Sequence, residues 1–138
     1  MSPEYELVPA APPVADYLRL RQEAGLSPKA EAQAEAALPG SWFACHVVQV
    51  DTGEIVGMGR VLGDGGWYFH VVDMAVLPAH QRKGLGDAVL GTLLERIRAV
   101  APPGAYVNLL ADAPGVRLYE RHGFVATAPG SIGMARVL

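Results

Sequence analysis

The feature that most restricts the fold is an amphipathic segment at residues 84–100 that lies between two β-rich runs. Its large apolar residues recur at helical spacing, which predicts a helix with one face on a core: Leu85, Val89, Leu93, Ile97 and Val100. A helical crossover of this length joins parallel strands, here residues 67–77 and 105–111, and does so with right-handed geometry. Because ligands favour the carboxyl ends of parallel strands, we expect the functional site at residues 76–86.

The pattern of the remaining residues predicts short strands and helices on both sides of this strand–helix–strand unit. The predicted strands are residues 5–8, 42–50, 55–62, 124–127 and 134–138, and the predicted helices are residues 14–24, 28–38 and 115–122. Ser27 is the expected N-cap of the helix at 28–38. The prediction is an α+β fold in a single domain, 1–138: a mixed sheet with an antiparallel N-terminal meander and one parallel βαβ unit, flanked by about four helices.

The composition of the chain argues against a nucleic-acid-binding protein and against a membrane protein. Net charge is −3 and the basic residues are scattered, so we expect no nucleic acid partner. Residues 1–13 hold four prolines and no Lys or Arg, unlike a signal peptide, and no apolar run approaches the ~20 residues that span a membrane. Cys45, the only cysteine, lies in an apolar run and reads as a buried strand residue, with a catalytic thiol as the alternative. A cytoplasmic location is expected.

Residues 81–87 have the chemistry of an anion site. A strand ends near Pro78, a polar loop follows, and a helix opens at Gly84, where first-turn amides lack intrahelical partners. Gly84 and Gly86 allow close approach to the backbone, and Arg82 and Lys83 add positive charge. This pattern suits a pyrophosphate. A glycine-softened helix start without a ligand is the alternative.

Two common nucleotide motifs do not fit this segment. A dinucleotide fingerprint needs a third glycine where the chain has Val89, and a phosphate-binding P-loop needs Gly-Lys-Ser/Thr after its spacer residues. The histidines His46, His80 and His122 show no metal-ligand spacing, so no metal site is predicted.

Two motifs resemble those of a known family. The run from Asp73 to Pro78, followed by Gln81-x-x-Gly84-x-Gly86, resembles the acetyl-CoA motif of the GNAT superfamily of N-acetyltransferases in order and spacing. Downstream, Leu118-Tyr119-Glu120-Arg121-His122-Gly123-Phe124 resembles the second hallmark of that superfamily. The expected element order matches too. The resemblance therefore implies a GNAT-like fold and an acetyl-CoA-dependent N-acetyltransferase.

The resemblance also implies roles for individual residues. The β-strand around Met74, Ala75 and Val76 would pair with the pantetheine arm of acetyl-CoA. The backbone of the loop and first helical turn would hold the pyrophosphate: Gln81, Arg82, Lys83, Gly84, Leu85, Gly86 and Asp87. Tyr119 would protonate the leaving thiolate, since a phenol (pKa about 10) and a thiol (about 8.5) are close in acidity. Local packing is the alternative for Tyr119.

The amine must lose a proton before it attacks, and candidate groups for this are few. His70 lies where many relatives carry a glutamate base, and Asp73 matches an aspartate of glucosamine-6-phosphate acetyltransferases. Asp112 also matches an acidic residue of that subgroup and is grouped with the cofactor site. Each of these residues also has a structural alternative. His70 would be a strand residue bonded to a neighbour, Asp73 a hydrogen-bond acceptor near a bulge, and Asp112 the N-cap of the last helix. A water relay is the other route.

The sequence does not identify the acceptor. The resemblance implies a primary amine on a small molecule or a peptide, which would attack the thioester directly in a ternary complex. A non-catalytic acyl-CoA-binding module or sensor is the alternative function. Arg60 is predicted to face solvent, with pairing to a substrate acid as the alternative. We also expect a homodimer, because residues 28–38 offer few large apolar side chains and the superfamily often dimerises through sheet edges or C-terminal strands.

Overall fold

The computed structural model describes all 138 residues and contains one five-stranded sheet of order β1-β2-β3-β4-β5. The strands are β1 (Tyr5–Val8), β2 (Phe43–Gln49), β3 (Ile55–Gly63), β4 (Tyr68–Val76) and β5 (Tyr106–Asn108). Neighbouring strands are antiparallel except β4 and β5, which are parallel. The mixed sheet, with a meander and one parallel crossover, confirms the predicted fold class.

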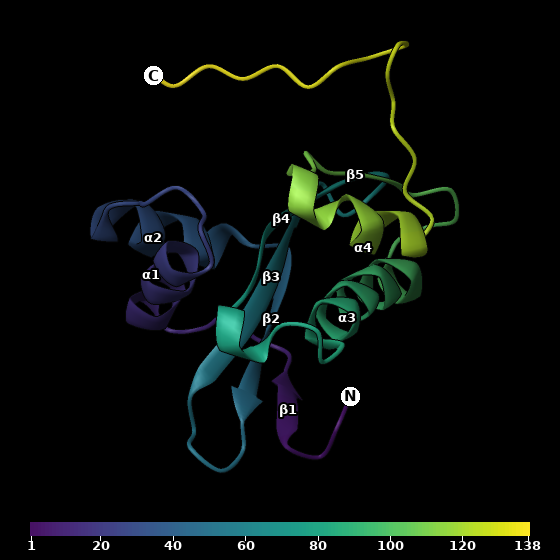
Figure 1. The fold of residues 1–138 in the computed structure, drawn as a ribbon. Coiled ribbons are helices and arrows are strands. Elements are labelled where there is room, and N and C mark those ends of the chain that lie inside the picture. The colour runs from purple at the N-terminus through teal and green to yellow at the C-terminus, as the bar shows by residue number, and fades with distance from the viewer.

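The helices form two layers on the sheet. They are α1 (Val14–Glu23), α2 (Glu31–Ala37), α3 (Leu85–Val100) and α4 (Val116–Arg121), with short 3₁₀ turns at Leu38–Gly40, Pro78–His80 and Ala113–Gly115. In Figure 1, α1 and α2 lie on one side of the sheet and α3 and α4 on the other. The chain after α4 leaves the body and runs across the top of the view. No helix is both long and apolar enough to span a bilayer.

The packing of α3 on the sheet produces most of the core. The predicted stripe is buried at Leu85, Val89, Leu93 and Ile97, whereas Val100 is 55% exposed at the end of the helix. At Gly59, in the middle of β3, a Cβ would lie 2.7 Å from both Met74 Sδ and Val89 Cγ1. Glycine there lets α3 approach the sheet closely.

Three local predictions were wrong at the N-terminal half of the chain. The helix predicted at 28–38 begins at Glu31, after Ala30, whose N–H bonds the Gln33 side chain. Ser27 is not its N-cap, because the Ser27 hydroxyl and carbonyl both accept hydrogen bonds from Arg21. Arg60 does not face solvent: it is 5% exposed and hydrogen-bonded to Asp73.

The predicted C-terminal strands are absent. Residues 122–138 form no helix or strand, and β5 is shorter than the predicted run at 105–111. A strand persists only where its N–H and C=O groups find partners. In the single chain the outer edge of β5 has no neighbouring strand, and neither does the apolar segment at 134–138.

Candidate active site

The loop between β4 and α3 has an unusual backbone. Arg82 has φ of 63° and Gly84 has φ of 79°, so two residues in left-handed conformations turn the chain into α3. The hydrogen bonding of the helix starts with the Ala88 N–H to the Gly84 carbonyl. The amides of Leu85, Gly86 and Asp87 therefore precede the first intrahelical bond and can bind an anion. A Cβ at Gly84 would meet no atom within 4 Å outside its own stretch of backbone, so the space beside this residue is open.

The two glycines of the predicted anion site, Gly84 and Gly86, have different structural roles. At Gly86 a Cβ would lie 3.3 Å from Leu118 Cδ2, so glycine at that position lets α4 pack against the start of α3. Asp87 strengthens the same contact through hydrogen bonds from Arg121 (3.0 Å) and His122 (2.9 Å between Oδ1 and Nε2). The hydrogen bond from Arg121 is the largest cause of a lowered Asp87 pKa. The first turn of α3 is thus fixed to α4.

Strand β4 has a free edge beside this loop. Its pairing with β5 covers only Tyr68–Tyr106, Phe69–Val107 and His70–Asn108, and beyond His70 the two strands separate. Met74 and Val76 lie on the separated part and are half-buried. The Val76 carbonyl accepts a hydrogen bond from the exposed Gln81 side chain at 3.0 Å, so that carbonyl points away from β3. An extended ligand has main-chain groups to pair with along this edge.

Tyr119 lies on the short helix α4 that borders this face. Its ring packs edge-on against Phe124 with 6.0 Å between centroids, and a Cβ at Gly115 would come within 3.0 Å of the ring. Burial, and secondarily the nearby charge of Asp112, raise the pKa of Tyr119 above its ordinary value. Asp112 is exposed and is the N-cap residue of the 3₁₀ turn Ala113–Gly115 that leads into α4, but its carboxylate makes no cap bond. Its effect on Tyr119 is electrostatic.

His70 belongs to a polar cluster across the β4–β5 junction. Its Nδ1 lies 2.7 Å from Asn108 Oδ1, and Asn108 Nδ2 donates to the Tyr68 hydroxyl at 2.6 Å. Because Oδ1 can only accept, this amide orientation places the histidine proton on Nδ1. In the neutral form of the ring, Nε2 then carries the lone pair that a general base uses.

Asp73 lies at a bulge of β4, with φ of 59°, where the register with β3 shifts. Its carboxylate accepts hydrogen bonds from Tyr17 (2.5 Å), Arg60 (2.8 Å) and Arg21, and it is 8% exposed. Burial first, and the Asp73 carboxylate second, raise the pKa of Tyr17. No buried side-chain nitrogen or oxygen in the chain lacks a partner. This arrangement favours the structural role of Asp73, joining α1 to the sheet.

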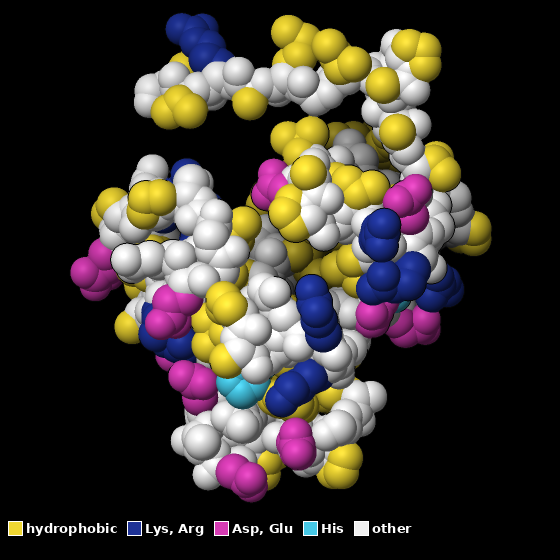
Figure 2. Space-filling view, in the orientation of Figure 1, with side chains coloured by type: hydrophobic (Ala, Val, Ile, Leu, Met, Phe, Trp, Pro, Cys, Tyr) yellow, Lys and Arg dark blue, Asp and Glu magenta, His cyan; other side chains and the backbone are white.

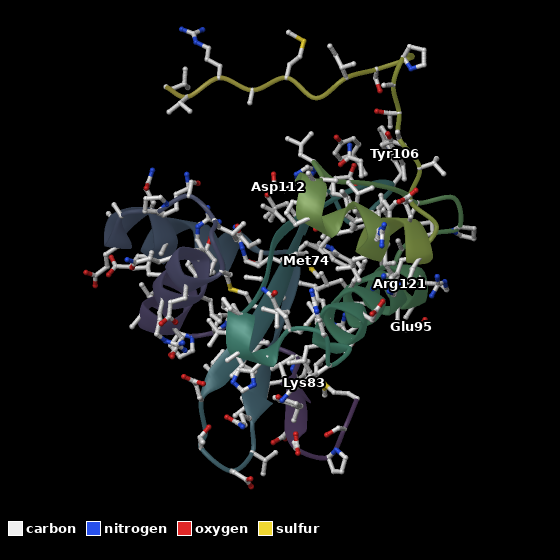
Figure 3. The ribbon with its side chains drawn as sticks, in the orientation of Figure 1. Met74, Lys83, Glu95, Tyr106, Asp112 and Arg121 are labelled. Atoms are coloured by element: carbon white, nitrogen blue, oxygen red, sulfur yellow. The ribbon has the colours of Figure 1, made fainter.

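The candidate residues follow one another along one face. In Figure 3, Met74 lies between Lys83, beside the start of α3, and Asp112, before α4. Figure 2 shows basic side chains on this face over the loop that leads into α3. The face thus combines positive charge and free amides at one end, an unpaired strand edge in the middle, and Asp112, before α4, at the other end.

A comparison with protein families decides the family of this chain. Residues 41–126 match the family described as an acetyltransferase (GNAT) domain. The match is longer than half of the chain and includes β2 through α4. The chain belongs to the GNAT acetyltransferase family.

Solved structures of GNAT proteins have the same fold. A probable acetyltransferase of unknown function from meticillin-resistant Staphylococcus aureus is 37% identical, with a TM-score of 0.91 over 97% of this chain and 99% of that chain. A GNAT-family acetyltransferase from Streptococcus pneumoniae is 25% identical, with a TM-score of 0.80 over 97% of this chain and 98% of that chain.

A curated relative gives a shorter match. An uncharacterized N-acetyltransferase of Pyropia yezoensis is 28% identical over 81 residues, which cover 59% of this chain and 45% of that protein. The chain thus matches less than half the length of this relative.

The GNAT domain groups some predicted residues and separates others. The loop at 81–84, the first turn of α3 and the free edge of β4 lie together, and α4 with Tyr119 is attached to that turn. Asp73 instead points toward α1. Cys45 is fully buried, its Sγ lies 3.9 Å from the Val89 carbonyl, and burial raises its pKa to about 12, which confirms the buried-strand prediction.

Sequence reasoning missed Asn108, the partner of His70. A polar residue between Val107 and Leu109 in an apolar run was the available signal. Its contact with His70 depends on the β4–β5 register, which no local pattern specifies.

Proposed function

We propose that this chain transfers an acetyl group from acetyl-CoA to a primary amine of a small molecule or peptide, by direct attack in a ternary complex. The observation that carries the proposal is the early end of the β4–β5 pairing at His70–Asn108, next to the free amides at the start of α3. This geometry fits a ligand that combines a pyrophosphate with an extended amide-bearing arm.

Acetyl-CoA supplies the activated thioester when it is bound. The backbone amides of residues 81–87 hold its pyrophosphate, with Arg82 and Lys83 adding positive charge. Main-chain groups of the segment from Met74 to Val76 pair with the pantetheine arm as a further strand would. Gln81 gives up its bond to the Val76 carbonyl when that pairing forms.

Tyr119 is the general acid of the proposal. A phenol carries its proton at neutral pH, so the proton of Tyr119 is available for the sulfur that leaves, although the raised pKa of Tyr119 makes it a weaker acid than an ordinary tyrosine. The Asp87 bonds to α4 position the helix that carries it. The raised pKa of the buried Cys45 thiol argues against an acetyl-cysteine intermediate.

His70 is the general base of the proposal. Asn108 accepts the Nδ1 proton of His70 and so leaves Nε2 free to take a proton from the acceptor ammonium. A water relay between the amine and Nε2 serves the same step. The hydrogen bonds of the Asp73 carboxylate with Tyr17, Arg21 and Arg60 argue against this role for Asp73.

Calorimetry tests the binding half of the proposal. Wild-type protein should bind CoA and acetyl-CoA 1:1 and should bind NAD and ATP far more weakly. Lys83→Glu should weaken CoA binding at least about tenfold, through repulsion of the pyrophosphate. Lys29→Glu, the same substitution at an exposed site beside α2, is the control and should leave the affinity unchanged. Equal affinity for NAD would contradict the proposal.

Turnover tests the catalytic half. Acetyl-CoA consumption should be measured over a library of primary amines, and activity with at least one amine is expected. Tyr119→Phe should lower kcat by about 10²–10⁴-fold with nearly unchanged acetyl-CoA affinity. Tyr106→Phe, an exposed tyrosine of β5, is the matched control. Tight CoA binding without turnover of any amine would favour a non-catalytic acyl-CoA sensor.

A further inference from the structure

Strand β1 reaches the loop of the proposed cofactor site through one side chain, Tyr5. The Tyr5 hydroxyl lies 2.8 Å from His80 Nδ1, and the two rings meet edge to face with 5.7 Å between their centroids. Both side chains are buried. The residues that match the GNAT family begin at residue 41, so β1 lies outside the matched part of the chain. The contact of Tyr5 with the loop is therefore a feature that the family match does not include.

His80 has a partner for each of its ring nitrogens. It ends the 3₁₀ turn Pro78–His80, directly before the loop at 81–84. A phenol can donate to a bare Nδ1 or accept from Nδ1–H, so the bond to Tyr5 forms with either tautomer of the imidazole. On the other side of the ring, Nε2 lies 3.7 Å from Glu54 Oε1, in the segment that joins β2 to β3. The start of the loop is thus attached to β1 and faces the β2–β3 turn.

Tyr5 also contacts the other end of the loop. The Lys83 Nζ lies 5.9 Å from the centroid of the Tyr5 ring, within the range of a cation–π interaction. Figure 3 shows Lys83 beside β1. One buried tyrosine therefore contacts His80 and Lys83, the residues on either side of Gln81 and Arg82.

The backbone between these two contacts is strained. Arg82 has φ of 63°, a left-handed conformation that a residue with a side chain seldom adopts. Such a conformation persists only where the surrounding structure holds it. The Arg82 side chain is exposed, so the packing that holds this residue comes from its neighbours. Tyr5 supplies such contacts on both sides of it, at His80 and at Lys83.

We propose that Tyr5 is a positioning residue of the cofactor site, which fixes the loop at 81–84 in the shape that presents the amides at the start of α3 to a pyrophosphate. Its hydroxyl anchors His80, its ring anchors Lys83, and the two anchors hold Arg82 in the left-handed conformation. The loop backbone is then already in place when the ligand arrives, and pre-organisation of this kind increases affinity. That the loop binds a pyrophosphate rests on the proposed function, whereas the anchoring of the loop by Tyr5 does not.

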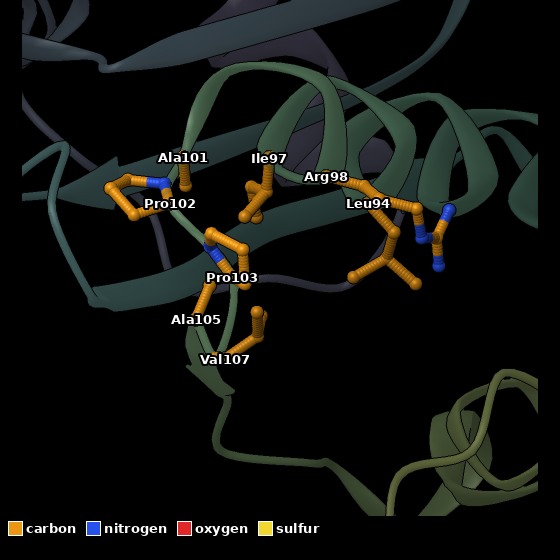
Figure 4. A pocket seen from close by; sticks show the side chains of 9 residues that line it. Leu94, Ile97, Arg98, Ala101, Pro102, Pro103, Ala105 and Val107 are labelled. Atoms are coloured by element: carbon orange, nitrogen blue, oxygen red, sulfur yellow. The ribbon is translucent and has the colours of Figure 1, made fainter.

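Limited trypsin digestion tests the anchoring without any ligand. Trypsin cleaves after Arg82 and Lys83 when the loop opens, since proteolysis of a folded protein requires local unfolding. Tyr5→Leu removes both anchors and should increase the rate of cleavage in the loop at least about tenfold, because the open form is more populated. Arg98 is the internal control site, because its side chain is 72% exposed at the far end of α3, beside a hollow of about 350 Å³ (Figure 4). Cleavage after Arg98 should keep its wild-type rate.

Two conservative variants separate the anchoring from a general loss of stability. Tyr5→Phe keeps the ring and removes only the hydroxyl, so cleavage in the loop should increase by roughly threefold to tenfold, even if Tyr5→Leu does not fold. Tyr17→Phe is the matched control, because Tyr17 is also a buried tyrosine, but its hydroxyl donates to Asp73. Tyr17→Phe should lower the urea midpoint and leave the rate of cleavage in the loop unchanged.

Glycine at position 82 tests how the anchors act. Glycine adopts the left-handed conformation without strain, so the loop of an Arg82→Gly protein depends less on Tyr5. Calorimetry should show that Tyr5→Leu weakens CoA binding at least about tenfold in the wild-type background and less than about threefold in the Arg82→Gly background. A role of Tyr5 in overall stability alone would give no such difference between the two backgrounds.

Each outcome supports or overturns the positioning role. Unchanged cleavage in the loop of both Tyr5 variants would overturn it. Equal acceleration in the loop and after Arg98 would mean that Tyr5 stabilises the whole domain and does not anchor the loop. Equal losses of CoA affinity in both backgrounds would mean that Tyr5 does not act through Arg82. Faster cleavage in the loop of a protein that binds no CoA would support the anchoring and refute the proposed function.

Discussion

Replacing Asp73 by asparagine separates its structural role from a catalytic one. The substitution keeps the shape of the side chain but removes the buried negative charge between Arg21 and Arg60, which are 7% and 5% exposed. It also places an amide N–H₂ group, which can only donate, against side chains that donate to the Asp73 carboxylate in the wild type. Two buried guanidinium groups then lose their only ionic partner.

The expected loss follows from this burial. Breaking a buried ion pair by removing one partner costs about 3–5 kcal/mol, because an uncompensated charge remains inside. A domain of this kind has a total unfolding free energy of about 5–15 kcal/mol, so the substitution should remove a large fraction of the stability. With a urea dependence of about 2 kcal/mol per molar, the unfolding midpoint should fall by roughly 2 M.

Urea unfolding followed by circular dichroism is the assay, with Asp16→Asn as the matched control. Asp16 makes a partly exposed pair with Arg19 at 3.4 Å, and its loss should cost less than about 1 kcal/mol. The acetyl-CoA turnover of folded Asp73→Asn, measured with an accepted amine, should stay within a few-fold of wild type. A variant as stable as wild type but inactive would refute the structural assignment and restore Asp73 as a catalytic candidate.

Three further predictions concern packing, thiol reactivity and acid stability. Gly59→Ala should lower the unfolding free energy by about 1–3 kcal/mol in urea titrations because its Cβ would lie 2.7 Å from Val89 Cγ1, while Gly40→Ala, with no atom within 4 Å, should be near neutral. Cys45, with its pKa raised to about 12, should react with iodoacetamide at pH 8 on the order of 10³ times more slowly in native than in unfolded protein; equal rates in a mass-spectrometric time course would show that the thiol is accessible. Asp87 has a lowered pKa, so its stabilising bonds to Arg121 are fully present above about pH 4 and are lost as pH falls through the folded pKa. Asp87→Asn should therefore lower the unfolding free energy at pH 6 by less than about 1 kcal/mol in urea titrations. At a pH below the pKa of Asp87 in both the folded and the unfolded protein, the substitution should have no effect. An equal loss at both pH values would mean that the charge of Asp87 does not contribute to stability.

Local patterns in the sequence determined the elements that lead to the site. The alternation from β1 to β4 and the helical stripe of α3 report burial on one face, and these elements lie within two residues of their predicted bounds. The glycines and basic residues of the loop at 81–84 likewise carry their chemistry locally, since a helix start exposes its amides in any fold. The parallel pairing of β4 and β5 followed from the length of the crossover.

Tertiary structure decided the partners of the polar side chains. Arg60 and Asp73 looked like a surface residue and a candidate base, yet packing of α1 on the sheet brings Tyr17 and Arg21 to them and makes a buried ionic cluster. Asn108 meets His70 only because of the β4–β5 register. The strands predicted at 124–127 and 134–138 have the composition of strands but no partner in the single chain. A strand's hydrogen bonds are made with another strand, so composition alone cannot establish one, whereas a helix makes its backbone bonds within its own segment.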